Sequence, residues 1–413
     1  MSKVYVADKE TLDKIYDIVS ADGVYGFIEH NSTLAPGSRI EYIGKNAGYA
    51  PVKVTMGGGF SLGSWGGFSV LANNKPWMVN ADGTPDYELN ADDYTKKLDG
   101  TASDVSNTSY AGGAFSWICK VWKKEYMVGD DRYVLFSETK KEGFEPVGFI
   151  DDNNEELEGV WIPMFYNTNG TTKATCIGAG QPEENNQTSA QKTAIDAFGA
   201  RAKFFGGAIV ETLQDLLIMW AKTTDIQGAY GKGNCSGYVN DATVHYGVKP
   251  NAVVGGGQFY GTTDGTSLNK ILHSIVLGTY QQWMRDPYTI SVKGKLKVSK
   301  NYKYDLGASG YTDTGINYDE VADTSWHYPH KYKTVAGFGS VPSLPPYNGS
   351  TALGGCDGFI VNREITAVAL RFGGCDFGLH VGVRALHLDG TATHANWSVG
   401  SAVLLLPPVG VAA

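Results

Sequence analysis

The chain has 413 residues, a formal net charge of −9 and no run of basic side chains, so its length predicts two or three domains and its charge argues against partners such as nucleic acids or anionic membranes. Aromatic residues make up 12% of the chain, charged residues only 19%, and 53 glycines are scattered without a period. This composition predicts many turns, few long helices and either a surface suited to recognition, because Tyr and Trp give large and stiff contact areas, or simply a β-rich fold.

The first predicted element is a short helix from Asp8 to Val19, with an apolar face that includes Leu12 and Ile15. So short a helix is not stable alone in water. It either docks on its own domain or packs with copies of itself around a symmetry axis, and residues 1–22 are therefore interpreted as a trimerisation or attachment segment. The start MSKVYVADKE lacks the features of a secretion signal, so we expect synthesis in a cytoplasm and no membrane insertion.

Residues 23–166 are predicted to form a β-rich domain. Short runs of β-branched and aromatic residues alternate with turns there, and the glycine-dense stretch at 55–70 lacks the Lys-Ser/Thr pair of a phosphate-binding loop. The runs read as strands are Arg39–Ile43, Val52–Met56, Phe68–Ala72 and Tyr133–Ser137.

A polar stretch from Asn167 to Thr193 is taken as the domain boundary. Two helices are predicted next, at Lys192–Phe205 and Ile209–Lys222, because apolar residues recur on one face of each. Beyond Gly228 long Gly, Asn and Asp loops predict few regular elements until a last strand at Val399–Leu406. The predicted class is α+β: a β-rich N-terminal region followed by a domain at 167–413 with two helices and long loops.

The residues that could carry chemistry form no catalytic pattern. Pro329 separates His327 from His330, the Asp99–Asp104 run lacks the distal Glu of a calcium loop, and the acidic pairs are read as solvated loop charges. The five cysteines are odd in number and widely spaced, which argues against a disulfide framework or a zinc site. The sequence therefore predicts no catalytic residue, no cofactor and no metal.

The stretch from Ala367 to Ser401 places Gly373 and Gly374 before a short strand and loop, and ends in an Asn-Trp-x-x-Gly element at 396–400. This order resembles the end of the variable proteins of diversity-generating retroelements, whose relatives include the major tropism determinant of a tailed phage. The segments NCSGY at 234–238 and LGTYQQWMRD at 277–286 look like the body of the same domain in phage tail proteins. The resemblance implies a C-type-lectin-like domain at 167–413.

By position, the resemblance implies a set of side chains displayed to a ligand and a set of scaffold residues, with Trp397 buried under the displayed face. Leu379 and Val381 depart from the Asn, Tyr, Ser or Asp usual at diversified positions, and the triplets that hold calcium in sugar-binding lectins are not intact. The displayed set is Cys375, Asp376, Phe377, Leu379, His380, Val381, Arg384, His387, Asp389 and His394, and the scaffold set is Gly373, Gly374, Asn396, Trp397 and Gly400.

The function implied is that of a bacteriophage receptor-binding protein of a tail fibre, without enzymatic activity. The expected partners are two further copies in a homotrimer, other virion proteins at the N-terminal region, and a host surface protein or glycan, with no nucleic acid. One alternative is a head fibre or capsid decoration protein of the same fold. Another is a polysaccharide-degrading or formylglycine-generating-like enzyme, the latter requiring Cys356 and Cys375 as a reactive pair.

Overall fold

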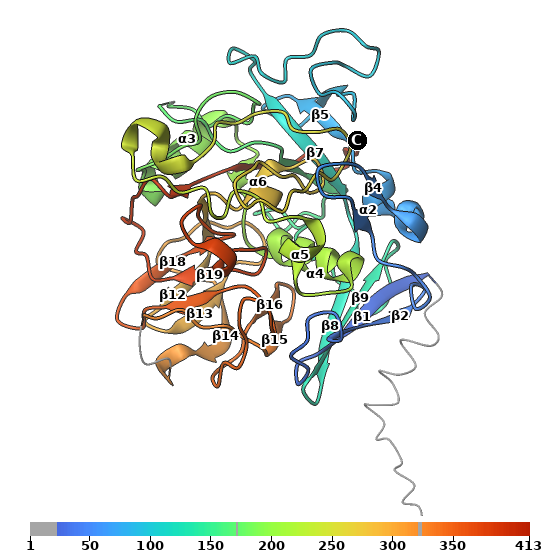
Figure 1. The fold of residues 1–413 in the computed structure, drawn as a ribbon, viewed down its shortest axis with the longest axis vertical. Coiled ribbons are helices and arrows are strands. Elements are labelled where there is room, and N and C mark those ends of the chain that lie inside the picture. The colour runs from blue at the N-terminus through green and yellow to red at the C-terminus, as the bar shows by residue number, and fades with distance from the viewer. Residues whose placement is uncertain (1–22, 171, 321–323) are drawn as a thin grey trace, which may run out of the picture.

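The computed structural model describes residues 23–170, 172–320 and 324–413, so the predicted helix at Asp8–Val19 lies outside the described residues. The fold is mixed and β-rich, which confirms the α+β class (Figure 1). Three larger sheets hold most of the strands in the described part of the chain, and the other strands form two separate two-stranded sheets.

The first sheet is antiparallel, in the order β2-β1-β9-β8. Alternate residues of β1 point to opposite faces, so Tyr25 and Phe27 enter the main core while Val24 and Ile28 join a smaller cluster on the other side. The strands predicted at Arg39–Ile43 and Tyr133–Ser137 are confirmed as β2 and β9. The bounds are β1 (Val24–His30), β2 (Ile40–Gly44), β8 (Trp122–Val128) and β9 (Asp131–Ser137).

The second sheet crosses the predicted domain boundary. Its order is β11-β21-β10-β7-β5-β6, and the C-terminal strand β21 lies between β10 and β11. One hydrophobic cluster extends from Tyr25 to Leu406. Residues 23–166 and 167–413 therefore share one core. The strands are β5 (Pro76–Val79), β6 (Pro85–Glu88), β7 (Gly113–Cys119), β10 (Gly159–Pro163), β11 (Ala202–Phe204) and β21 (Val403–Leu405).

The helix α4 (Ala208–Ala221) confirms the second predicted helix and is buried on every side, not on one face only. It contacts β2 and β16, and Figure 1 shows it near the centre of the molecule. The first predicted helix is shorter than expected: α3 (Thr188–Phe198) ends before Gly199, and the residues that follow form β11.

The prediction of a strand at Phe68–Ala72 is wrong, because this segment forms the short helix α2 (Ser69–Ala72). The carboxylate of Glu138 accepts a hydrogen bond from the Ser69 backbone N–H at 2.6 Å, which satisfies a donor at the first turn of this helix. The run predicted at Val52–Met56 is a strand only at β3 (Lys53–Val54), which pairs with β4 (Phe60–Ser61).

The region beyond Gly228 holds more regular structure than predicted. A third sheet runs β14-β13-β12-β18-β19-β17, with β20 parallel to β12, and the predicted last strand divides into β20 and β21, which belong to different sheets. Figure 1 shows β12, β13, β14, β18 and β19 on the side of α4 opposite to β1 and β2. The strands are β12 (Trp283–Val292), β13 (Lys295–Val298), β14 (Thr312–Asn317), β17 (Phe359–Val361), β18 (Thr366–Arg371), β19 (Leu386–Leu388) and β20 (Val399–Gly400).

The remaining elements are short. They are the hairpin β15 (Tyr332–Val335) and β16 (Gly339–Pro342), the helices α5 (Ile226–Tyr230) and α6 (Ile275–Thr279), and the 3-10 turns η1 (Gly63–Gly67), η2 (Ala242–Gly247), η3 (Tyr318–Glu320) and η4 (Gly378–His380). Within the described ranges, no helix has the length and apolar character needed to cross a bilayer.

Candidate ligand-binding face

The segment predicted to be displayed leaves β18 through the Gly373-Gly374 turn. Gly373 has a φ of 143°, and a Cβ at this position would lie 2.0 Å from Cγ1 of Val381. A side chain there would overlap the returning chain, and the backbone would be strained as well. Glycine at 373 therefore has a physical reason, which is the close return of residues 381–382 against the end of β18.

The structure divides the predicted display set into exposed and buried members. Asp376 and Leu379 are exposed, and Leu379 is the more apolar of the two, with 42% of its surface accessible. Cys375, Val381 and Arg384 are buried, so the prediction that they are displayed is wrong. In the folded chain they cannot touch a ligand at the surface. The half-buried members are Phe377, His380, His387, Asp389 and His394.

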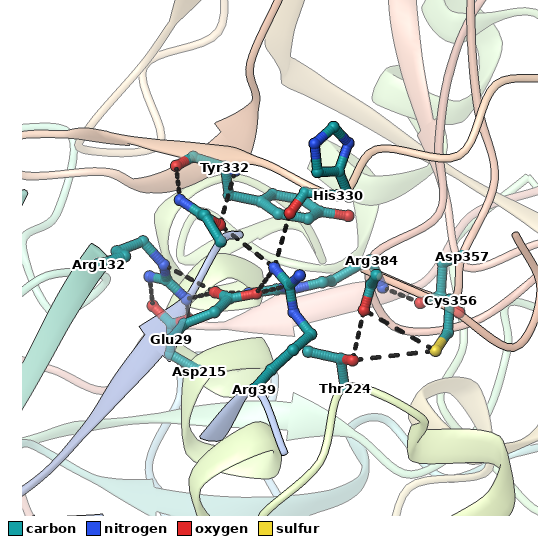
Figure 2. Close-up of polar contacts among 12 residues, drawn as sticks. Glu29, Arg39, Arg132, Asp215, Thr224, His330, Tyr332, Cys356, Asp357 and Arg384 are labelled. Carbon is teal, nitrogen blue, oxygen red and sulfur yellow. Dashed lines mark hydrogen bonds and ion pairs between the residues drawn. The ribbon is translucent and has the colours of Figure 1, made fainter. Parts of the chain in front are cut away.

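Arg384 is buried because its guanidinium pairs with Glu29 of β1 (Figure 2). The two groups form a bidentate pair at 2.7 and 2.8 Å, and Arg39 and Arg132 bind the same carboxylate at 2.9 and 3.0 Å. Arg132 continues the network to Asp215 of α4 at 2.6 and 3.1 Å. Burial of a charge is costly unless it is paired, so this cluster fixes the C-terminal segment against β1 and α4.

Electrostatics keep this cluster ionised. Burial alone would raise the pKa of Glu29, but Arg384, Arg132 and Arg39 together hold the pKa well below its usual range. Burial would likewise raise the pKa of Asp215, and Arg132 and Lys123 lower it to about 2. Glu29 and Asp215 are therefore ionised at neutral pH, and each is paired with arginine inside the protein.

The backbone around Arg384 is held by further contacts. The Arg384 N–H donates to Asp357 at 2.7 Å, and its guanidinium lies 4.0 Å from the centre of the Tyr332 ring (Figure 2). The side chain of Gln227 donates to the carbonyl of Val381. Residues 381–384 thus form part of a rigid base rather than of the face.

Three of the half-buried display residues pack against the rings of Trp283 and Trp326. Phe377 meets Trp283 and Trp326 at centroid distances of 5.3 and 5.5 Å, and His387 lies 5.2 Å from Trp283. Burial lowers the pKa of His387 to about 4, so its imidazole is neutral at pH 7. His380 contacts the ring of Trp326 at 5.3 Å. These rings orient the segment while one edge of it stays accessible.

A second segment joins the face: the exposed loop 236–247. Its Tyr238 N–H donates to the carbonyl of Cys375 at 3.1 Å, and Gly378 N–H donates to the carbonyl of Cys235 at 2.8 Å. Two tyrosines of this loop stack on Trp397, with Tyr246 at 4.9 Å and Tyr238 at 5.5 Å. The expectation that Trp397 is buried is therefore corrected, because its indole is half-exposed beneath the two tyrosines.

Sequence reasoning missed the role of this loop. The NCSGY motif at 234–238 indicated the body of the domain, but nothing in the local pattern places Tyr238 or Tyr246 beside Trp397. The remaining scaffold residues lie nearby: the Asn396 carbonyl accepts from the Asn185 N–H at 3.0 Å, and Gly400 pairs with β12. The face is thus assembled from segments far apart in the sequence.

The cysteines and the histidine considered for catalysis or metal binding have surroundings that explain them structurally. Cys356 and Cys375 are free thiols, and burial raises the pKa of each to about 12, so both are protonated at neutral pH. Nδ1 of His330 accepts from the Asn348 N–H at 3.1 Å. In the described part of the chain, no group of three or more His, Cys, Asp or Glu residues is arranged to hold a metal ion.

A cavity of about 520 Å³ lies away from this face, between residues 145–154 and 298–312. Its lining includes Glu145, Lys300 and Lys303 but none of the predicted display residues. The exposed residues of the face lie on loops, and the buried charges hold the scaffold beneath them in place.

Comparison with known proteins adds no relative to this picture. No protein-family model matches the chain, and no curated protein matches it either.

Proposed function

We propose that this chain is a bacteriophage virion adhesion protein that contacts the host cell surface through the face formed by residues 375–380, loop 236–247 and Trp397. The observation that carries the proposal is the division of labour within one segment. Asp376 and Leu379 are open to solvent, while Arg384, eight residues or fewer away, is anchored to Glu29. Exposed side chains on a rigid base are the arrangement expected of a binding protein.

The architecture of residues 167–413 supports a C-type-lectin-like domain as part of this proposal. Its first strand, β11, pairs with its last, β21, which brings the two ends of the region together, and β21 also pairs with β10 of the preceding region. The helices α3 and α4 lie on either side of β11 in the sequence, and long loops connect the strands of the third sheet. A base of paired strands with long loops is suited to surface variation without loss of the fold.

A homotrimer attached to other virion proteins by its N-terminal region belongs to the same proposal. Several copies on one virion would raise the effective affinity of a weak single site by orders of magnitude, roughly 10²- to 10⁴-fold for linked sites. The predicted helix at residues 8–19 lies outside the described residues, so the support for this part is the sequence pattern alone.

The first experiment asks whether the purified full chain competes with phage for host cells. We expect the wild-type protein to lower the adsorption rate, and Leu379→Asp to compete at least about tenfold less well, because a charge replaces an exposed apolar contact at the face. Leu98→Asp is the matched control, since Leu98 is also an exposed leucine, at 64%. A protein that does not compete, or a Leu379→Asp variant equal to wild type, would contradict the proposal.

Location on the virion separates adhesion from decoration. Gold-labelled antibody against the chain should mark the tail tip in electron micrographs. Label on the capsid, together with no competition for adsorption, would instead indicate a head fibre or decoration protein. A reverse transcriptase gene nearby, with a template repeat matching residues 360–400, would support diversification of the face.

A further inference from the structure

The stacked rings of Tyr238, Tyr246 and Trp397, hereafter the Trp397 platform, have the geometry of a flat binding surface. The two tyrosine rings are nearly parallel, with an interplanar angle of 3° and centroids 6.5 Å apart. At that separation the two tyrosine rings are not in face-to-face contact with each other, and the plane of the indole lies within 29° of both. Tyr238 has 43% of its surface exposed.

The backbone of the loop is held in a strained form that keeps the rings in this arrangement. His245 and Tyr246 both have left-handed φ angles, 49° and 54°, which cost non-glycine residues about 1 kcal/mol or more each. Hydrogen bonds hold the turn: Tyr246 N–H donates to the Asp241 carbonyl, and Val239 N–H to the Tyr246 carbonyl, at 3.0 and 3.1 Å. A loop that needed only to cover the core could avoid this strain.

The polar groups around the platform are hydrogen-bonding groups without a concentration of positive charge. The Tyr238 hydroxyl donates to Asn240 at 3.2 Å, Asp241 is exposed, and His245 lies 3.2 Å from Glu184. Loop 236–247 contains neither Lys nor Arg. An anionic ligand such as a phosphate or a sialic acid would therefore meet carboxylates, whereas a neutral polyol would find acceptors at the rim.

We infer that the Trp397 platform binds a neutral hexopyranose of a surface glycan without a metal ion. The electron-rich ring faces attract the C–H groups of one face of a pyranose ring, and the hydroxyls at the sugar edge reach Asn240 and Asp241. The inference deepens the proposed function, since it names the class of receptor for the same face. A protein receptor is the competing outcome.

Saturation-transfer NMR on the full chain tests this directly, with methyl β-D-galactopyranoside, methyl α-D-glucopyranoside and methyl α-D-mannopyranoside as probes. We expect saturation on the ring protons of one sugar face for at least one glycoside, unchanged by a metal chelator. Tyr238→Ala should weaken binding about five- to tenfold, and Tyr238→Phe should retain it because the ring remains.

The matched control is Tyr126→Ala. Tyr126 of β8 and Tyr133 of β9 form a second half-exposed stacked pair, far from the platform in the sequence. Their ring centroids are 5.1 Å apart and their planes differ by 8°. This variant should bind the glycosides as the wild type does. Equal losses in Tyr126→Ala and Tyr238→Ala, or no saturation with any of the three probes, would overturn the inference.

Experiments on host cells distinguish glycan binding from the adhesion role. Periodate treatment of host cells should abolish binding of the chain, while protease treatment should not; the reverse would show a protein receptor and overturn the glycan inference while leaving adhesion intact. Glycoside binding without competition for phage adsorption would have the opposite meaning, since the site would stand and the adhesion role would fall.

Discussion

Gly373 is the residue on which the return of the C-terminal segment depends. We expect Gly373→Ala to lower the free energy of unfolding by about 3 kcal/mol, because the new methyl group would overlap Val381 in addition to the backbone strain. Thermal and urea unfolding would measure the loss.

Gly378→Ala is the control for this prediction. Gly378 also has a left-handed φ, 57°, but no atom lies within 4 Å of a Cβ placed there. This change should therefore cost about 1 kcal/mol, the backbone contribution alone. Equal effects at the two positions would show that contact with Val381 does not restrict residue 373.

At the scale of elements, the link between β1 and the C-terminal segment is ionic. Replacement of Arg384 by Met should cost about 3 kcal/mol of stability at pH 7, because Glu29 loses its bidentate partner in a buried site. Lys331→Met, which breaks the exposed pair of Lys331 with Asp130 at 2.6 Å, should cost less than about 1 kcal/mol. Chemical denaturation of both variants gives the comparison.

The same pair predicts a dependence on pH. The folded pKa of Glu29 lies well below its ordinary value of 4.5, so its contribution to stability is complete above that value and is lost as the pH falls through the folded pKa. The difference between wild type and Arg384→Met should therefore shrink in acid. A difference that stays constant from neutral pH into strong acid would contradict an ionic origin.

Local sequence patterns predicted some elements and could not predict others. The apolar run of α4 sufficed to place a helix at 208–221 almost to the residue. The run at 202–204 continues the helical pattern of α3 but pairs instead with β21, some two hundred residues later. Such distant pairing leaves no local signature, and the capping of α2 by Glu138 is invisible for the same reason.

The candidate face follows the same rule. The sequence resemblance indicated the segment after Gly373, and Asp376 and Leu379 are indeed exposed. It placed Arg384 in the displayed set, because nothing in the neighbouring sequence reveals Glu29 as its partner. Tyr238 and Tyr246 were missed because they approach Trp397 only in the folded chain.

At the scale of the whole molecule, the largest hydrophobic cluster contains residues of both predicted domains. Because β21 lies between β10 and β11, and hydrophobic contacts run from Tyr25 to Leu406, we expect one cooperative unfolding transition in differential scanning calorimetry. Two resolved transitions, or a stable fragment of residues 167–413 after limited proteolysis, would show separate folding units instead.

The Arg384–Glu29 pair also sets limits on how this surface can evolve. Asp376 or Leu379 could be replaced at little cost to folding, since both side chains are open to solvent. A change at 384 would have to be accompanied by one at position 29, in a strand encoded more than a thousand nucleotides upstream. We therefore expect natural variants of this protein to differ freely along the outer edge of the segment while keeping these two charges together.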